Sequence, residues 1–104
     1  MTARLVLTPA ARQDRRDEVR YYRQEAGSKV AVQPVEELQK ALGELERNPS
    51  IGSPLIGQRL DIAGLRSWRL NRFPLSVWYF ERGDHVLVIR VVGHRQAIEG
   101  IDLD

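Results

Sequence analysis

Hydrophobic positions divide this chain into a helical first half and a strand-rich second half. A short strand is predicted for Arg4–Leu7. Thr8 and Pro9 then mark a helix start, because a threonine hydroxyl accepts hydrogen bonds from exposed N–H groups and proline at the first helical position loses none. We expect this helix to continue to about Ala26, where Gly27 provides a left-handed stop.

The apolar stripe of this first helix is thin. Arg15 interrupts the spacing expected of an amphipathic helix. We therefore expect the helix to pack on one side only. The apolar members of the stripe are Ala11, Val19, Tyr22 and Ala26.

A second, amphipathic helix is predicted from apolar residues that recur at steps of three and four. Ser28 is placed to cap it, and Asn48-Pro49 ends it. Pro34 conflicts with this pattern, because its ring collides with the preceding turn and removes one hydrogen bond. We expect either a kink at Pro34 or a helix whose regular part starts near it. The periodic residues are Ala31, Val35, Leu38, Leu42 and Leu45.

Turn-forming residues recur through positions 49–64, which we expect to form a turn-rich connection. Arg82-Gly83-Asp84 is typical of a hairpin turn, with glycine supplying a positive φ. Residues 86–92 are apolar on both faces apart from Arg90, as expected of a central strand. The sequence predicts three strands here, at residues 65–71, 75–81 and 85–92.

The predicted fold class is therefore α+β. An N-terminal strand is followed by a two-helix hairpin and then by a three-stranded antiparallel meander, against which the hairpin packs. The length of 104 residues and the 42% hydrophobic composition fit a single domain over residues 1–104.

Composition excludes several classes of protein. The chain has no cysteine, which excludes disulfides, thiolate metal sites and a cysteine nucleophile. No apolar run reaches the length of roughly 20 residues that a bilayer requires, and the first residues lack the apolar centre of a signal peptide. We expect a cytoplasmic protein that makes no contact with a membrane.

Positive charge is concentrated in the second half, although the net charge is only +2. Residues 59–95 contain seven arginines against three acidic residues, which favours an anionic partner. Arginine outnumbers lysine fourteen to two, so arginines that simply solvate a strand face are an open alternative.

Familiar catalytic motifs are missing from the sequence. It has no glycine-rich phosphate loop, no zinc ligand set and no nucleophile elbow, so we expect neither a metal nor a cofactor. His94 is a candidate acid or base, or else a structural residue at a strand end. Arg90 has a second interpretation as the partner of a buried carboxylate. The candidate basic surface consists of Arg66, Arg69, Arg72, Arg90 and Arg95.

Three stretches together resemble the C-terminal signature of ParE/RelE-family toxins from type II toxin–antitoxin systems of the plasmid-stabilisation type. They are 64–70, with its Arg-Ser-Trp sequence, 72–79, with an aromatic-Pro start, and 86–95, a Val-rich strand ending in Gly-His-Arg. The first half fits as well, in Thr8-Pro9-Ala10-Ala11, Asp14, Tyr21-Tyr22, 45–49, Gly52 and Pro54. Two residues depart from the family pattern, Arg15 and Pro34, and both lie in the helical hairpin.

The resemblance implies a toxin that a cognate antitoxin neutralises, with operator DNA bound only through the antitoxin. ParE-like members inhibit DNA gyrase, and the aromatic-Pro strand start and the modest net charge favour this branch. RelE-like members instead cut messenger RNA on the ribosome. For that activity the candidate catalytic residues are Tyr79, His94 and Arg95, with Arg66, Arg72 and Arg90 as further cations.

A third reading, from a different class, is a non-toxic binding module that acts as a co-repressor. All three readings imply an antitoxin. We expect it to contact the first and second helices and an exposed edge of the sheet.

Overall fold

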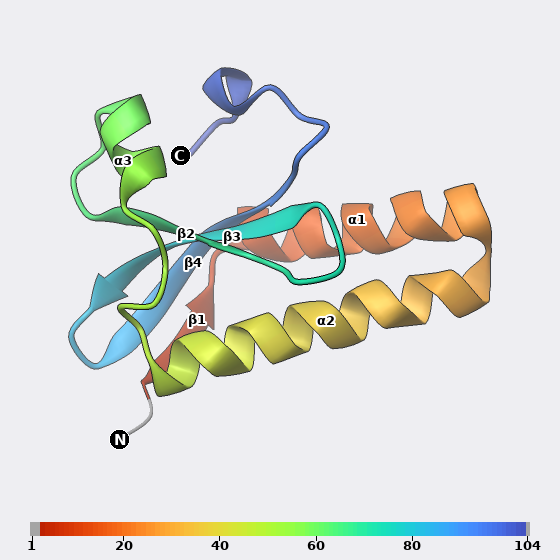
Figure 1. Cartoon of the computed structure of the whole chain (residues 1–104), viewed down its shortest axis with the longest axis horizontal. Helices are drawn as coiled ribbons and strands as arrows, with labels where there is room; N and C mark the ends of the chain where they lie inside the picture. Colours follow the sequence, from red (N-terminus) through yellow and green to blue (C-terminus); the bar gives the residue numbers. More distant parts are fainter. Residues whose placement is uncertain (1–2, 104) are drawn as a thin grey trace.

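The computed structural model describes residues 3–103, except for the side chains of residues 26 and 28–32. The α+β architecture predicted from the sequence is confirmed (Figure 1). In chain order the elements are β1 (Arg4–Leu7), α1 (Pro9–Ala26), α2 (Ser28–Arg47), α3 (Leu55–Leu60), β2 (Leu65–Arg69), β3 (Leu75–Arg82), β4 (His85–Gly93) and a short 3₁₀ helix (Ile98–Gly100).

The start of α1 follows the predicted capping pattern. The Thr8 hydroxyl accepts a hydrogen bond from the Ala11 N–H at 3.1 Å, and Pro9 occupies the first helical position. Gly27 ends the helix with a φ of +88°, the positive angle that only glycine adopts readily. Its ψ of 173° is extended rather than left-handed helical, and the chain turns directly into α2.

The second helix differs from its prediction at its start. Gly27, not Ser28, occupies the capping position, and Ser28 is the first helical residue. The regular helix does not begin near Pro34, because α2 runs from Ser28 to Arg47 with a buried Pro34 inside it. Burial of its ring and the packing of the following turns offset the lost hydrogen bond. Neither α1 nor α2 is apolar enough to cross a membrane, and no other described helix is.

The strands form one sheet in the order β1-β4-β3-β2. The meander β2-β3-β4 is antiparallel as predicted, and β1 joins it by pairing in parallel with β4. β4 is thus the internal strand that its apolar sequence predicted, and Val86, Val88 and Val91 are almost completely buried. Gly83 forms the β3–β4 turn with a φ of +65°.

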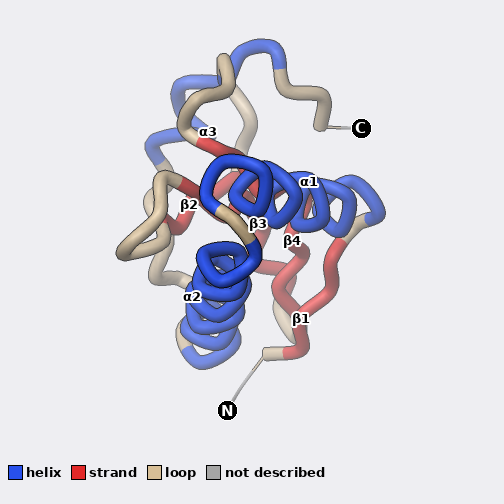
Figure 2. Tube along the Cα trace, turned by 90° about the vertical axis from the view of Figure 1, so that its right-hand side faces the viewer, coloured by secondary structure: helices blue, strands red, loops and turns tan. Residues whose placement is uncertain are grey.

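Each face of the sheet has its own hydrophobic cluster. The α1–α2 hairpin covers one face, where Leu38 and Leu45 pack against Val77 and Tyr79. Figure 2 shows the two helices of the hairpin, α1 and α2, side by side. The other face carries Trp78, Ile89, Leu65 and Val92, and it is covered by α3 and the C-terminal segment through Ile56, Leu60, Ile98, Ile101 and Leu103.

The connection predicted for residues 49–64 also contains a short helix, α3, which the sequence pattern did not predict. Its six residues are too few to be stable as an isolated helix. The helix forms because Ile56 and Leu60 pack against the second cluster and because Gly57 lies against the Leu65 carbonyl, where a Cβ would come within 2.6 Å. These contacts exist only once the sheet has formed, so the local sequence alone does not predict α3.

Tyr79 fastens the connection between α2 and α3 to the sheet. Its hydroxyl donates to the Pro49 carbonyl at 2.7 Å and accepts from the Gly52 N–H at 2.8 Å. Gly52 lies so close that an added Cβ would be 2.5 Å from the Tyr79 oxygen and 3.0 Å from the Ser67 carbonyl. This position therefore has no room for a side chain.

Replacing Gly52 with alanine tests this contact. We expect Gly52→Ala to lower the free energy of unfolding by on the order of 1–3 kcal/mol, because the tyrosine and the β2 backbone must move apart. Gly43→Ala is the matched control, since its Cβ meets only the flexible end of Arg47 at 3.4 Å. It should raise stability by about 0.5–1 kcal/mol through helix propensity. Equal effects of the two substitutions in urea denaturation would contradict this account.

Candidate functional site

The first helix replaces β1 as the neighbour of β4 where β1 ends. The last β1–β4 pair is Leu7 with Val88. Beyond it, the Thr8 hydroxyl donates to the Ile89 carbonyl at 2.9 Å, and Asp14 Oδ2 accepts from the Val91 N–H at 2.9 Å. Side chains of α1 and of its cap therefore satisfy backbone groups that a further strand would otherwise pair.

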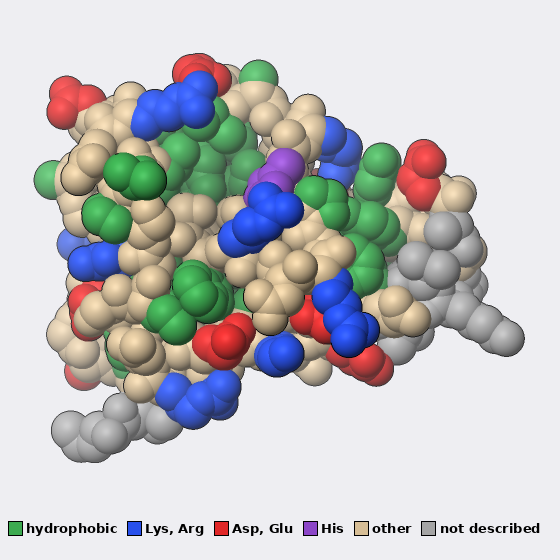
Figure 3. All heavy atoms as spheres, in the orientation of Figure 1, with side chains coloured by type: hydrophobic (Ala, Val, Ile, Leu, Met, Phe, Trp, Pro, Cys, Tyr) green, Lys and Arg blue, Asp and Glu red, His purple; other side chains and the backbone are tan. Residues whose placement is uncertain are grey.

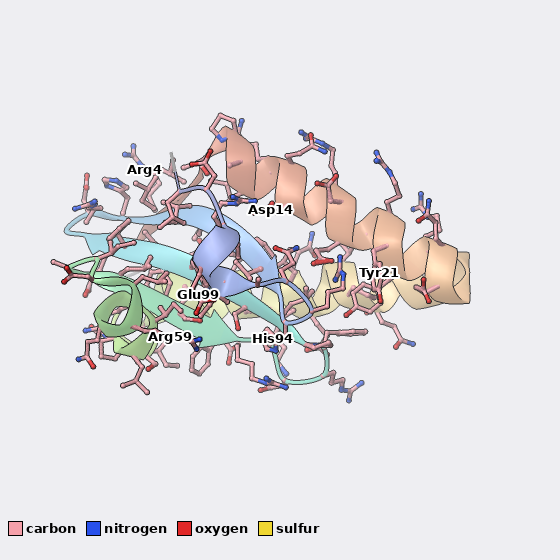
Figure 4. The ribbon with its side chains drawn as sticks, turned by 90° about the horizontal axis from the view of Figure 1, so that it is seen from above. Arg4, Asp14, Tyr21, Arg59, His94 and Glu99 are labelled. Carbon is pink, nitrogen blue, oxygen red and sulfur yellow. The ribbon has the colours of Figure 1, made fainter. Side chains whose placement is uncertain are left out.

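Asp14 also binds Arg90 of β4 through two hydrogen bonds. Arg90 Nε donates to Oδ2 and Nη2 donates to Oδ1, each at 2.7 Å. The side chains are only 10% and 19% exposed, and Asp14 lies on the side of α1 that faces the sheet (Figure 4). The hydrogen bonds that Arg90 donates to Asp14 raise the pKa of Arg90 above its ordinary value. The open alternative in which Arg90 pairs with a buried carboxylate is the one the structure supports.

One helical turn later, Glu18 repeats this arrangement with Arg95. Glu18 is 3% exposed, and Arg95 Nη1 donates to its Oε1 at 3.1 Å. Nη2 lies 2.8 Å from Oε2, an ion pair whose angles are not those of a hydrogen bond. The Arg95 guanidinium also lies over the Tyr21 ring at 3.7 Å, a cation–π contact. Glu18 raises the pKa of Arg95 by the same cause as in the first pair.

Arg66 and Tyr79 are directed towards the connection after α2. Arg66 Nη1 donates to the Gly52 carbonyl at 2.6 Å, beside the tyrosine hydroxyl. Tyr79 is completely buried, and this burial raises the pKa of its phenol. With both hydrogen-bonding roles of the hydroxyl occupied, Tyr79 has no path to an external substrate in this conformation.

His94 connects Arg69 to Ser76. Its Nδ1 lies 3.0 Å from Arg69 Nη1, and its Nε2 lies 2.7 Å from Ser76 Oγ. Because arginine only donates, Nδ1 must be the acceptor and Nε2 must carry the proton that Ser76 accepts. Burial and the adjacent Arg69 charge lower the pKa of His94, so the ring is neutral near pH 7.

The five arginines of the candidate basic surface have three kinds of partner, namely carboxylates, backbone carbonyls and a histidine ring. Arg90 and Arg95 bind acids of α1, Arg66 binds loop carbonyls, and Arg69 binds a histidine. The Arg72 side chain is 78% exposed, and its Nε lies 3.7 Å from Glu37 of α2. On the face of the molecule that Figure 3 shows, basic side chains are dispersed, and several have acidic side chains beside them. The described residues include no group of three or more histidine, aspartate or glutamate side chains placed to hold a metal ion.

A groove of about 540 Å³ runs between α1 and α2. Its apolar lining comes from both helices, and Arg15, which departs from the family pattern, lies at its rim. The groove thus combines a hydrophobic lining with a strongly basic rim. Its lining residues are Arg15, Arg16, Val19, Arg20, Arg23, Val35, Leu38, Gln39 and Leu42.

Comparison with known families accounts for this architecture. The family model described as the ParE toxin of the type II toxin–antitoxin system parDE matches residues 5–98. The chain belongs to the ParE toxin family. The resemblance noted in the sequence is thereby confirmed over nearly the whole chain, and a comparison with curated protein sequences gives no match.

Two solved structures share the fold of this ParE-family toxin. A chain from the chromosomal ParDE system of P. aeruginosa superposes with a TM-score of 0.73 at 22% identity, covering 86% of this chain and 94% of that one. A chain from the RelBE2 toxin–antitoxin complex of Mycobacterium tuberculosis gives a TM-score of 0.57 at 24% identity, covering 89% and 99%. At these identities the likeness concerns the fold alone.

Sequence reasoning missed Asp14 and Glu18 as the partners of Arg90 and Arg95. A signal for them exists in the thin stripe of α1, because the steps from Ala11 to Asp14, Glu18 and Tyr22 are three, four and four. Acids at core-facing positions of a helix require buried cations. Arg90 in β4 and Arg95 just after it are the cations that pair with them.

Replacing Asp14 with asparagine tests the importance of this pair. Asp14→Asn keeps the shape but leaves the Arg90 charge without its counterion. We expect the free energy of unfolding to fall by about 2–4 kcal/mol, as for other largely buried pairs that lose one partner. Asp17→Asn is the control on the same helix, because Asp17 is exposed and accepts a hydrogen bond from the exposed Gln13 side chain. If chemical denaturation finds equal losses for both variants, the Asp14–Arg90 pair does not stabilise the fold as described.

Proposed function

We propose that this ParE-family toxin inhibits DNA gyrase by direct binding and that a cognate antitoxin neutralises it. The observation that carries the proposal is that the groups RNA cleavage would need are already engaged within the fold. Cleavage by a 2′-hydroxyl requires a proton acceptor, a proton donor and cations that meet the developing charge. Binding to a protein target requires none of these.

The candidate catalytic residues support this choice when taken one by one. Tyr79 is buried with its hydroxyl engaged twice. Both nitrogens of His94 have partners within the chain, and its lowered pKa leaves it neutral, which makes it a poor proton donor. The charge of Arg95 is met by Glu18. A ribosome-dependent nuclease would have to rearrange all three.

The groove between α1 and α2 supports an antitoxin partner. The two structural neighbours come from a ParDE system and a RelBE2 toxin–antitoxin complex. An amphipathic segment binds by placing its apolar side in such a groove, and acidic residues beside that side would meet the arginines at the rim. We propose that the antitoxin contacts the first and second helices at Val19, Val35 and the adjoining arginines, which line this groove.

The gyrase proposal is tested with the purified toxin in two parallel reactions. We expect inhibition of gyrase supercoiling, which premixing with the antitoxin abolishes, and no cleavage of a transcript on translating ribosomes. Transcript cleavage without gyrase inhibition would establish the nuclease instead. If the chain expressed alone causes no growth arrest, does not inhibit gyrase and cuts no transcript, the result favours a non-toxic co-repressor module.

Charge reversal in the groove tests the antitoxin contact. We expect Arg20→Glu to weaken binding of the antitoxin encoded by the adjacent reading frame at least about tenfold, a loss of about 1.4 kcal/mol, because an acidic segment is then repelled. Arg12→Glu is the matched control, since Arg12 is an exposed arginine of α1 that does not line the groove. Calorimetric titration that finds equal affinities for both variants would place the antitoxin elsewhere.

A further inference from the structure

A second hollow, separate from the helical groove, lies between α3 and β2. Its volume is about 320 Å³, at the low end of the range for ligand sites. It lies on the side of the sheet that carries α3 and the C-terminal segment, opposite the helical hairpin. Its lining residues are Ser53, Leu55, Ile56, Arg59, Ser67 and Arg69.

The hollow has an exposed apolar part. Leu55, in the first turn of α3, is a large hydrophobic residue whose exposed fraction is 68%. Ile56 beside it is partly buried and packs against the second cluster. A single exposed leucine is ordinary on a surface, but here it borders a concave site that also contains charge.

The two arginines of the hollow differ in how their charge is met. Arg59 pairs with Glu99 of the C-terminal segment at 2.6 Å, and the two side chains lie next to each other in Figure 4. Arg69 has no carboxylate partner among the described residues, and its contact is the neutral ring of His94. Its positive charge is therefore available to a ligand.

Arg69 is also held in place before any ligand arrives. Ser76 is 8% exposed and accepts from His94 Nε2–H, so the ring presents its Nδ1 lone pair to Arg69. A long exposed arginine normally loses rotamer freedom when it binds an anion. The contact with His94 already restricts the Arg69 rotamers, so less rotamer freedom is lost when an anion binds. Such preorganisation is expected of a binding residue and is not needed for an arginine that only solvates the surface.

We infer that the hollow between α3 and β2 is a docking site for an acidic segment of a partner protein. A carboxylate of that segment pairs with Arg69, and a neighbouring branched aliphatic side chain covers Leu55. Charge complementarity and the apolar lining favour such a peptide over a nucleic acid. The hollow has no aromatic side chain on which a base could stack, and single-stranded nucleic acids rely on such stacking.

This site is independent of the proposed antitoxin groove, since the two share no residue. A segment that lies only in the groove leaves the hollow open, and loss of one site leaves the other in place. The inference therefore adds a second protein-binding surface to the toxin. It does not depend on gyrase being the target.

The test is an NMR titration of the full-length ¹⁵N-labelled chain with the capped peptide acetyl-Glu-Leu-Asp-Ile-amide. We expect saturable shifts at the amides of α3 and β2 and at the Arg69 side chain, with millimolar affinity. Arg69→Gln should weaken binding about fivefold, the upper range for one exposed ion pair. Leu55→Ser should weaken it by about the same factor, because the aliphatic contact is lost. Both positions are exposed, and the spectrum of each variant reports directly whether it is folded.

Three controls make the result decisive. Arg4→Gln removes an exposed arginine of β1, at the opposite edge of the sheet, and should leave the affinity unchanged. The amide peptide acetyl-Gln-Leu-Asn-Ile-amide should bind at least about fivefold more weakly. The inference is overturned if both peptides bind equally, if shifts appear only in the α1–α2 groove, or if a thymidine tetranucleotide binds at Arg69 more tightly than the acidic peptide.

Discussion

The acidic side of α1 against the edge of β4 is the contact on which the rest of the structure depends. β1 is only four residues long, so the second half of β4 has no strand beside it on that edge. Asp14 provides the acceptor that the Val91 N–H would otherwise lack. A carboxylate is costly to bury without a counterion, and Arg90 supplies it. The contacts of Asp14 with Val91 and Arg90 together fix both the rotation of α1 and its position along the sheet.

The same contact decides which positive charges remain available to partners. Arg90 and Arg95 belong to the framework because α1 carries Asp14 and Glu18 on its inner side. The outer side of α1 carries arginines that line the helical groove, and β2 carries Arg69. Basic composition alone does not distinguish these groups. The distinction lies in whether a buried acid or a loop carbonyl already binds the guanidinium, and it separates arginines that stabilise the fold from arginines that can bind.

The second face of the sheet shows how a chain of this length covers both sides of four strands. The hairpin covers one face, and the other is left to a helix of six residues and a C-terminal segment. The family model ends its match at residue 98, whereas Ile101 and Leu103 continue the packing against the cluster that contains Trp78. The cover on this face is thinner than the hairpin, which is why an open hollow remains beside α3.

The sequence by itself determined the elements whose causes are local. The Thr8 cap, the glycine at position 27 and the apolar run of β4 act through neighbouring residues, so periodicity and turn chemistry predicted them. Only the tertiary structure decided that α3 forms, that α2 continues through Pro34 and which partner each arginine has. Asp14 and Arg90 are 76 residues apart, and no local pattern relates them. Long-range burial brings them together, and it assigns the arginine to the framework.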